Sequence, residues 1–295
     1  MTTAILPPKN DEVFKMLFGD EHDTELLIGF LRAVLPLPDD DYEELTLKNP
    51  FLPSEILNDK NGILDVLVQT KSGRQIDIEI QVANHMTFKS RVLYYLSRIF
   101  TRQIGEGDAY HQLKPVIGIV ITDFFWIEDS EAYHNAYYLY DKKSGSIFSD
   151  DLSLHTLELP KVGKKDEHTD LWAWLEFLKA KNEEELEMLI KEHPVVQPAV
   201  TKLVRLSASE EARAIFEARE RARREALTWQ YEAKIREAQG REEGEKKGRE
   251  EGREEGEKNA QLVIARKALG KNMPIEDIVE LTGLSAAEIL ALRVH

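Results

Sequence analysis

The chain has 295 residues, of which 42% are hydrophobic, so it can bury a core in one large domain or two smaller ones. Its formal net charge of −15 excludes a protein that coats nucleic acid non-specifically, because that function needs clustered lysine and arginine. The absence of cysteine excludes disulfides and thiolate zinc sites, and the lack of a long apolar run leads us to expect a cytoplasmic protein without membrane spans.

The N-terminal part of the chain predicts a helical segment followed by a hairpin of two strands. Apolar residues recur at helical spacing over residues 11–35, with an interruption near Gly19. Residues 63–69 and 75–82 have the composition and alternation of strands, and the short polar turn between them predicts a hairpin.

The middle of the chain predicts one further helix and several strands. Residues 88–104 predict a helix that ends at Gly105. Residues 115–122 are almost wholly apolar and β-branched, which is typical of a strand buried on both faces. Residues 133–141 and 152–159 are weaker strand candidates. This order of elements predicts an α/β fold with a mixed central sheet flanked by helices.

The remainder of the chain is expected to be largely helical, with one unusual segment. Residues 171–178, 183–190 and 201–237 predict helices, whereas within 239–258 a glycine stands at every fourth position among nearly balanced charges. Each interior glycine costs a helix about 1 kcal/mol relative to alanine, which favours a spacer or marginal helix. A helix whose glycines allow close packing on a partner is the alternative.

The last segment, residues 259–295, predicts a helix, a turn and a second helix. Gly283 is expected to end the first helix, and Ser285 with Glu288 forms a capping box for the second. The pattern is similar to a helix-turn-helix, but its second helix offers few groups that read bases. We therefore expect these helices to serve packing or a homo-oligomer and not DNA reading.

Polar side chains share one face of the predicted hairpin. Asp77, Glu79 and Gln81 alternate with isoleucines in the second strand, and the turn brings Asp65 of the first strand close to them. Carboxylates on neighbouring strands can grip Mg²⁺, which promotes phosphodiester hydrolysis. Judged from alternation alone, these residues could instead form an ordinary polar strand face without a metal site. For Asp77 we expect a solvated position on that face.

Several strings of the sequence resemble the PD-(D/E)XK nuclease superfamily, most closely its branch of recombination-promoting nucleases, also described as transposase-like proteins. The resemblance covers roughly residues 10–125 and rests on residues 10–19, 62–66, 78–81, 90–95 and 116–124. It implies a restriction-endonuclease-like fold with an α-helical C-terminal extension. It also implies an endonuclease that acts on DNA in recombination, DNA mobility or defence.

The same resemblance assigns roles to individual residues. It makes Asp65 and Glu79 the ligands of Mg²⁺, or of another divalent cation such as Mn²⁺, and it puts Gln81 in the place of the superfamily lysine. Because glutamine carries no charge and cannot act as a base, Gln81 can only position water or phosphate. Asp11 is the candidate that completes the site from the first helix, although it is equally suited to cap that helix.

The helix after the hairpin is expected to contact DNA. Four of its residues step by four, three and four positions and so share a face: Arg91, Tyr95, Arg98 and Arg102. A basic stripe with an aromatic residue suits a phosphate backbone, whereas a solvated face paired with glutamates is the alternative. The apolar face is expected to hold Leu93, Leu96 and Phe100. Lys89 is the candidate to replace the charge missing at Gln81.

The expected organisation is a nuclease domain at 1–160, a helical extension at 161–238, the glycine-rich segment at 239–258 and the terminal helices at 259–295. The expected activity is Mg²⁺-dependent hydrolysis of DNA by an endonuclease. Two alternatives stay open: a catalytically inactive nuclease fold that binds nucleic acid, and an assembly protein that acts through its C-terminal helices.

Overall fold

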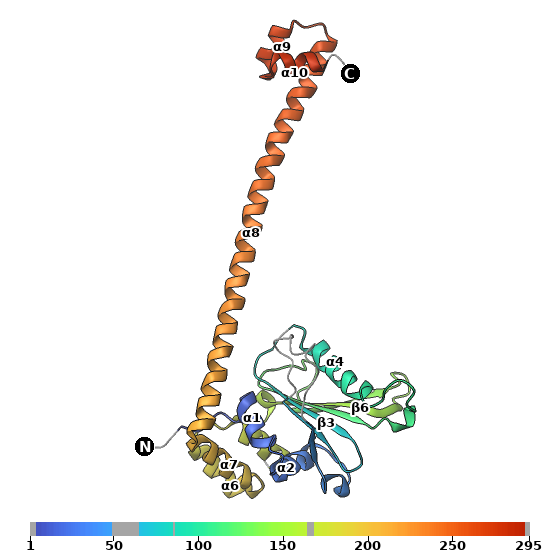
Figure 1. Cartoon of the computed structure of the whole chain (residues 1–295), viewed down its shortest axis with the longest axis vertical. Coiled ribbons are helices and arrows are strands. Elements are labelled where there is room, and N and C mark those ends of the chain that lie inside the picture. The colour runs from blue at the N-terminus through green and yellow to red at the C-terminus, as the bar shows by residue number, and fades with distance from the viewer. Residues whose placement is uncertain (1–3, 49–64, 85, 164–167, 293–295) are drawn as a thin grey trace. The chain divides into compact units, whose positions relative to one another are not determined.

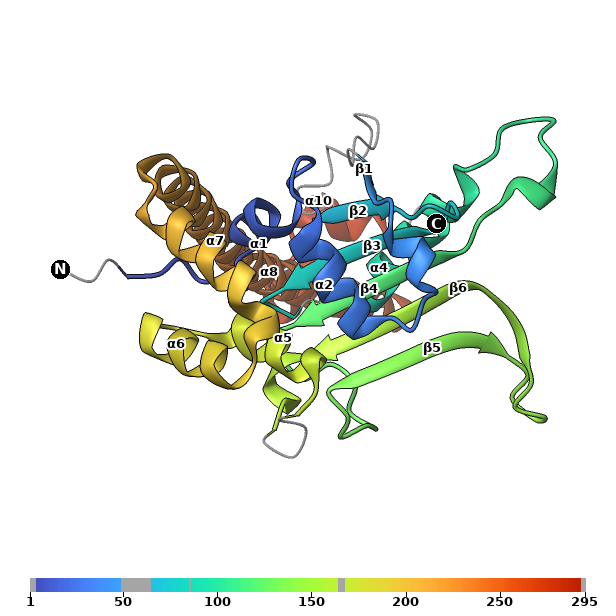
Figure 2. The same cartoon turned by 90° about the horizontal axis from the view of Figure 1, so that it is seen from below.

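The computed structural model describes residues 4–48, 65–84, 86–163 and 168–292. The chain divides into two compact units, Met1–Glu220 and Arg221–His295. The first unit contains a mixed sheet with helices on both faces (Figures 1 and 2). None of the helices in the described ranges is long and apolar enough to cross a membrane.

The sheet of the first unit has the strand order β1-β2-β3-β4-β6-β5. Its strands are β1 (Thr46–Lys48), β2 (Val66–Gln69), β3 (Gln75–Gln81), β4 (Val116–Thr122), β5 (His134–Tyr140) and β6 (Ile147–Glu158). β1, β2 and β3 pair antiparallel, β4 lies parallel to both β3 and β6, and β5 closes the edge antiparallel to β6. The predicted hairpin and the predicted buried strand are therefore confirmed, within the residues described. β6 begins several residues before the predicted start.

Helices cover both faces of this sheet. One face bears α1 (Asp11–Phe18), α2 (Glu25–Val34), α5 (Asp170–Lys179), α6 (Glu183–Glu192) and α7 (Gln197–Ala208), and the other bears α4 (Phe88–Thr101) (Figures 1 and 2). Short 3₁₀ turns lie at Asp39–Tyr42, Tyr110–Gln112, Leu159–Lys161 and Pro194–Val196. The predicted segment 11–35 forms two helices because the first ends at Gly19, where the sequence shows its interruption. α4 ends three residues before the predicted stretch does.

The main core lies between the sheet and the larger helical layer. Ile76, Ile78 and Ile80 of β3 point into it and meet aromatic side chains of α1, α2 and α5. Phe18, Phe30 and Trp174 pack edge to face or tilted, with ring centroids less than 6 Å apart in each pair. This layer holds β3 rigidly from behind, so the polar face of the strand is presented toward α4.

The second unit contains most of α8 (Glu210–Gly270) together with α9 (Ile275–Thr282) and α10 (Ala286–Ala291). The predicted terminal helices are confirmed: Gly283 ends α9 at φ 71°, and Ser285 and Glu288 form the capping box of α10. They form a small core with the end of α8, from Ala265, Ala268, Ile278, Leu284 and Ile289.

The glycine-rich segment is part of α8 and is helical throughout, so a flexible spacer does not describe it. Ion pairs spaced by four residues, such as Arg241 with Glu245 and Arg253 with Glu257, stabilise this helix and offset part of the glycine cost. The acidic and basic residues that stand between the glycines thus help to stabilise the helix through these ion pairs. The cost of the glycines to a helix, and not this charge pattern, is what favoured a spacer in the sequence.

Candidate active site at the β2–β3 hairpin

The hairpin brings Asp65 and Glu79 to the same level of two neighbouring strands. Val66 pairs with Ile78 in the antiparallel register, so the residue before Val66 stands opposite the residue after Ile78. The Asp65 side chain is 6% exposed, and the whole of Glu79 is 8% exposed. The sheet thus places two shielded carboxylates side by side, as the strand pattern leads one to expect.

Asp65 has partners from both β3 and α1. Its Oδ2 accepts a hydrogen bond from the backbone N–H of Ile80 at 2.8 Å, and its Oδ1 lies 3.2 Å from Lys15 Nζ. Burial raises the pKa of Asp65 to about 7, the nearby charges of Glu79 and Asp11 add to this rise, and Lys15 and the Ile80 amide oppose it. Lys15 is therefore a cation that holds Asp65 in place.

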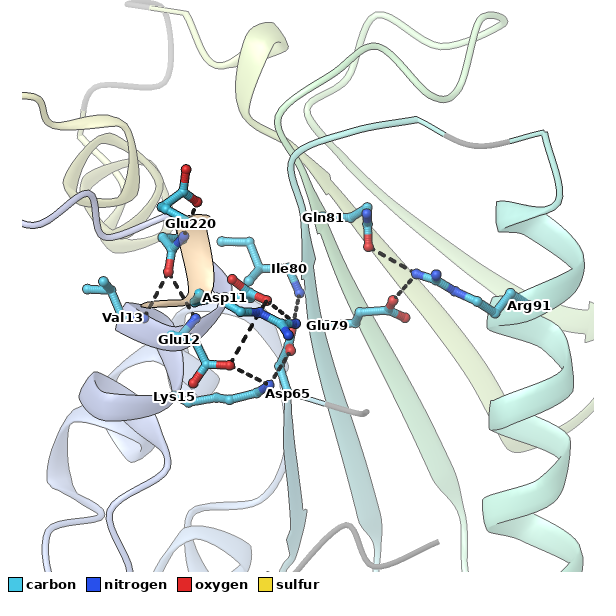
Figure 3. A network of polar contacts seen from close by, with 12 residues as sticks. Asp11, Glu12, Val13, Lys15, Asp65, Glu79, Ile80, Gln81, Arg91 and Glu220 are labelled. Carbon is cyan, nitrogen blue, oxygen red and sulfur yellow. Dashed lines mark hydrogen bonds and ion pairs between the residues drawn. The ribbon is translucent and has the colours of Figure 1, made fainter. Parts of the chain in front are cut away.

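Glu79 and Gln81 share one partner, Arg91 of α4. Arg91 Nη2 donates hydrogen bonds to Glu79 Oε1 at 2.5 Å and to Gln81 Oε1 at 3.0 Å (Figure 3). Burial raises the pKa of Glu79, and Arg91 opposes the rise. Gln81 Nε2 donates to the carbonyl of Ala83, so both ends of the amide are held and its orientation follows from its partners.

Asp11 lies at the border of this site and is held by α8. The N-cap of α1 is Asn10, whose side chain accepts from the amides of Glu12 and Val13, so the interpretation of Asp11 as the cap is wrong. Asp11 Oδ2 instead accepts from Arg219 Nη2 at 2.9 Å and from Nε at 3.1 Å. Its negative charge adds a small contribution to the raised pKa of Asp65, which is caused mainly by burial.

Asp77 is buried, and the expectation of a solvated position is wrong. It is 7% exposed, because α4 covers this face of β3 at Gly118, the residue with which Asp77 pairs in β4. Its Oδ1 has no hydrogen-bond partner among the described residues. Burial, together with Glu79 and Asp65, raises its pKa well above the usual range. Burial and the two neighbouring carboxylates therefore favour the neutral, protonated form of Asp77.

The residues of the hairpin fit a divalent cation, but they do not form a complete cage. Within the described ranges, no three Asp, Glu, His or Cys side chains come close enough to hold a metal ion. Two carboxylates with water and a phosphate oxygen are nevertheless the usual donor set of Mg²⁺. Lys15 and Arg91 supply positive charge to Asp65 and Glu79, so a cation that binds these carboxylates competes with both side chains.

The predicted DNA-binding stripe of α4 is not a continuous surface. Tyr95 is 4% exposed and packs in the core with Leu96 and Ile99, and Arg91 points into the hairpin site. Arg98 donates to the hydroxyl of Tyr94, and Arg102 is exposed. The buried face of α4 consists of Phe88, Val92, Tyr95, Leu96 and Ile99. Leu93, expected on the apolar face, is 57% exposed, because the helix is rotated from the predicted phase.

The cations that offset the negative charge of Asp65 and Glu79 are not the lysine expected from the sequence. Lys89 is exposed and has no contact with Gln81 among those that the described residues make, whereas Arg91, two residues later, contacts Gln81 directly. Lys15 stands one helical turn after Asp11, so both lie on the same face of α1. That spacing was visible in the sequence, but nothing local indicated that this face meets Asp65.

Comparison with known protein families finds a match over most of the chain. The model of the family described as PD-(D/E)XK nuclease family transposase matches residues 8–233, which include the whole sheet, α4 and the hairpin site. No curated protein and no solved structure matches the chain.

Proposed function

Because the chain belongs to the PD-(D/E)XK nuclease family transposases, we propose that it is a Mg²⁺-dependent endonuclease that hydrolyses DNA phosphodiester bonds. The mixed sheet, flanked by helices and followed by a long C-terminal helix, is a restriction-endonuclease-like α/β fold. The observation that carries the proposal is the pairing of two carboxylates with little exposure, Asp65 and Glu79, at opposite positions of adjacent strands and beside Gln81.

In this proposal, Asp65 and Glu79 hold the cation with one carboxylate each. Mg²⁺, or another divalent cation such as Mn²⁺, supplies a Lewis acid that offsets charge on the phosphate and lowers the pKa of the attacking water. Gln81 orients that water through its amide, since it can neither carry charge nor accept the proton. The proton therefore goes to a carboxylate of the site, because Lys15 beside Asp65 is already a cation and has no acceptor.

Positive charge at the scissile phosphate comes from Arg91 in this proposal. A guanidinium stays protonated and presents several donors in a plane, so it binds phosphate oxygens well but does not act as a base. Asp11, held by Arg219 at the border of the site, contributes its negative charge beside Asp65. A role in recombination, DNA mobility or defence follows from the family and is part of the proposal.

A cleavage assay on supercoiled plasmid DNA, with Mg²⁺ or with EDTA, tests this function. We expect Asp65→Asn to reduce Mg²⁺-dependent nicking by roughly 100-fold or more, because several kcal/mol of charge stabilisation is lost. Asp41→Asn is a matched control, since Asp41 is a buried aspartate that pairs with Arg74 in the turn at the far end of β3. The Asp41→Asn variant should keep its nicking activity at temperatures where it stays folded.

Two outcomes would contradict the assignment. Equal nicking by the wild type and Asp65→Asn would remove Asp65 from the site. If neither the wild type nor the two variants nick DNA but all still bind it, the chain is a catalytically inactive nuclease fold that binds nucleic acid.

A further inference from the structure

Arg91 joins two functional groups of the hairpin through a single nitrogen. Its Nη2 binds both Glu79 Oε1 and Gln81 Oε1, and its guanidinium stands 5.2 Å from the ring centroid of Phe88. The side chains of Arg91 and Glu79 are 15% and 11% exposed, so water screens this ion pair only weakly. The contact is therefore a strong restraint on where the Glu79 carboxylate points.

This restraint holds Glu79 toward α4 and away from Asp65. Figure 3 shows the Glu79 carboxylate directed at Arg91, while Asp65 lies beside Lys15 of α1. Two carboxylates can share one cation only when both turn to the space between them. A divalent cation at this site must therefore displace Arg91 from at least one oxygen of Glu79.

DNA offers Arg91 another partner. Guanidinium groups bind phosphate oxygens through charge-assisted hydrogen bonds, often two in parallel. Arg91 lies in the first turn of α4 and contacts the residues that the proposed function places at the scissile phosphate. A phosphate that engages Arg91 would thus free Glu79 at the moment when the substrate arrives.

We propose that Arg91 is a positioning residue that couples DNA binding to metal binding. It holds Glu79 in the DNA-free protein and moves to a backbone phosphate in the complex, which releases Glu79 to the cation and the Gln81 oxygen to the attacking water. This inference rests on the proposed function, since it assumes that the site takes DNA and a divalent cation. Coupling of this kind is reciprocal, so the cation must also strengthen DNA binding.

The test measures Ca²⁺ binding to the full chain by calorimetry, without DNA and with a duplex oligonucleotide. Ca²⁺ is the probe because the readout is then affinity and not turnover. For the wild type we expect DNA to tighten Ca²⁺ binding by roughly tenfold or more, within the ordinary range of coupling between sites. For Arg91→Gln we expect tight Ca²⁺ binding already without DNA, with little further gain from DNA.

A matched control removes an arginine from another buried carboxylate. Arg74→Gln leaves Asp41 without its ion pair at 2.8 Å, in the turn before β3, and should lower Tm without changing Ca²⁺ affinity. Arg91→Lys keeps the charge and should retain part of the dependence on DNA. A purely structural role of Arg91 would lower Tm and weaken Ca²⁺ binding together, which is the opposite sign from our expectation.

The outcomes separate this inference from the proposed function. Equal or weaker Ca²⁺ binding by Arg91→Gln in the absence of DNA overturns the inference, even if the wild type cleaves DNA. If Ca²⁺ affinity changes as expected but the wild type does not cleave DNA with Mg²⁺, the coupling is supported and the proposed catalytic function is overturned. Unchanged Ca²⁺ binding in Asp65→Asn overturns the inference, because the measured ion then binds elsewhere.

Discussion

Buried ionisable side chains on the sheet include the carboxyl groups of the hairpin and a histidine pair at the β5–β6 edge. At the hairpin, burial raises the pKa of Asp65, Asp77 and Glu79, and Lys15 and Arg91 offset part of this rise at Asp65 and Glu79 respectively. At the β5–β6 edge, His134 Nε2 and His155 Nδ1 lie 2.9 Å apart, so one ring donates a hydrogen bond to the other. Burial thus favours the neutral form both of the carboxyl groups at the hairpin and of the histidines at the edge.

The histidine pair predicts a pH dependence of stability. Burial, with a contribution from His134, lowers the pKa of His155 from its usual 6.5 to about 4. Below pH 6.5 the unfolded chain binds a proton on this ring that the folded protein does not yet bind. The stability that neutral His155 provides is therefore complete above pH 6.5 and is lost as the pH falls toward 4.

Thermal unfolding between pH 4 and pH 7 checks this expectation. The Tm of the wild type should fall across this interval more steeply than that of His155→Asn, whose side chain does not titrate there. Parallel curves for the two proteins would mean that His155 does not contribute to the acid sensitivity of the fold.

At the scale of elements, α4 links the sheet to the site. It connects the parallel strands β3 and β4, packs on their shared face, and carries Arg91 to the end of β3. The close packing depends on Gly118 in β4. An added Cβ there would lie 2.9 Å from Leu96 Cδ1 of α4 and 3.2 Å from Leu154 Cδ1 of β6.

Gly118→Ala should therefore lower the free energy of unfolding by about 1–3 kcal/mol, the usual effect of overpacking a core. Denaturant unfolding measures the change. Leu96→Val removes the nearest methyl group, so the double variant should lose less stability than the sum of the two single variants. Additive losses would show that Leu96 and Gly118 are not in tight contact.

At the scale of the molecule, the second unit has a core of its own but also exposes apolar side chains. Val263, Ile264, Leu281 and Leu290 are between 44% and 60% exposed, around a core of small and medium-sized residues. Exposed apolar groups in so small a unit suit an interface. This observation favours self-association through the C-terminal helices, which is the assembly role expected from the sequence.

Deletion of residues 259–295 tests that role. We expect the full chain to associate and the shortened chain to have a lower stoichiometry by light scattering, since the exposed apolar residues of α9 and α10 are removed with the segment. Circular dichroism of the shortened chain controls for the integrity of the first unit. The same stoichiometry in both chains would count against an assembly function of these helices.

The sequence by itself determined the elements whose signals are local. Alternation and a polar turn specify the β2–β3 hairpin, an unbroken apolar run specifies β4, and a capping box with a glycine specifies α9 and α10. The same periodicity placed Glu79 and Gln81 on one face of a strand, and family resemblance attached a chemistry to that face.

Only the tertiary structure decided what covers each face and which charges meet. Strand alternation shows that Asp77, Glu79 and Gln81 share a side, but not that α4 buries Asp77 there. Helical spacing grouped Arg91 with Tyr95, yet the rotation of α4 on the sheet turns Arg91 toward Glu79 and puts Tyr95 in the core. These contacts join residues distant in the chain, and their partners follow from how whole elements pack, which no local pattern encodes.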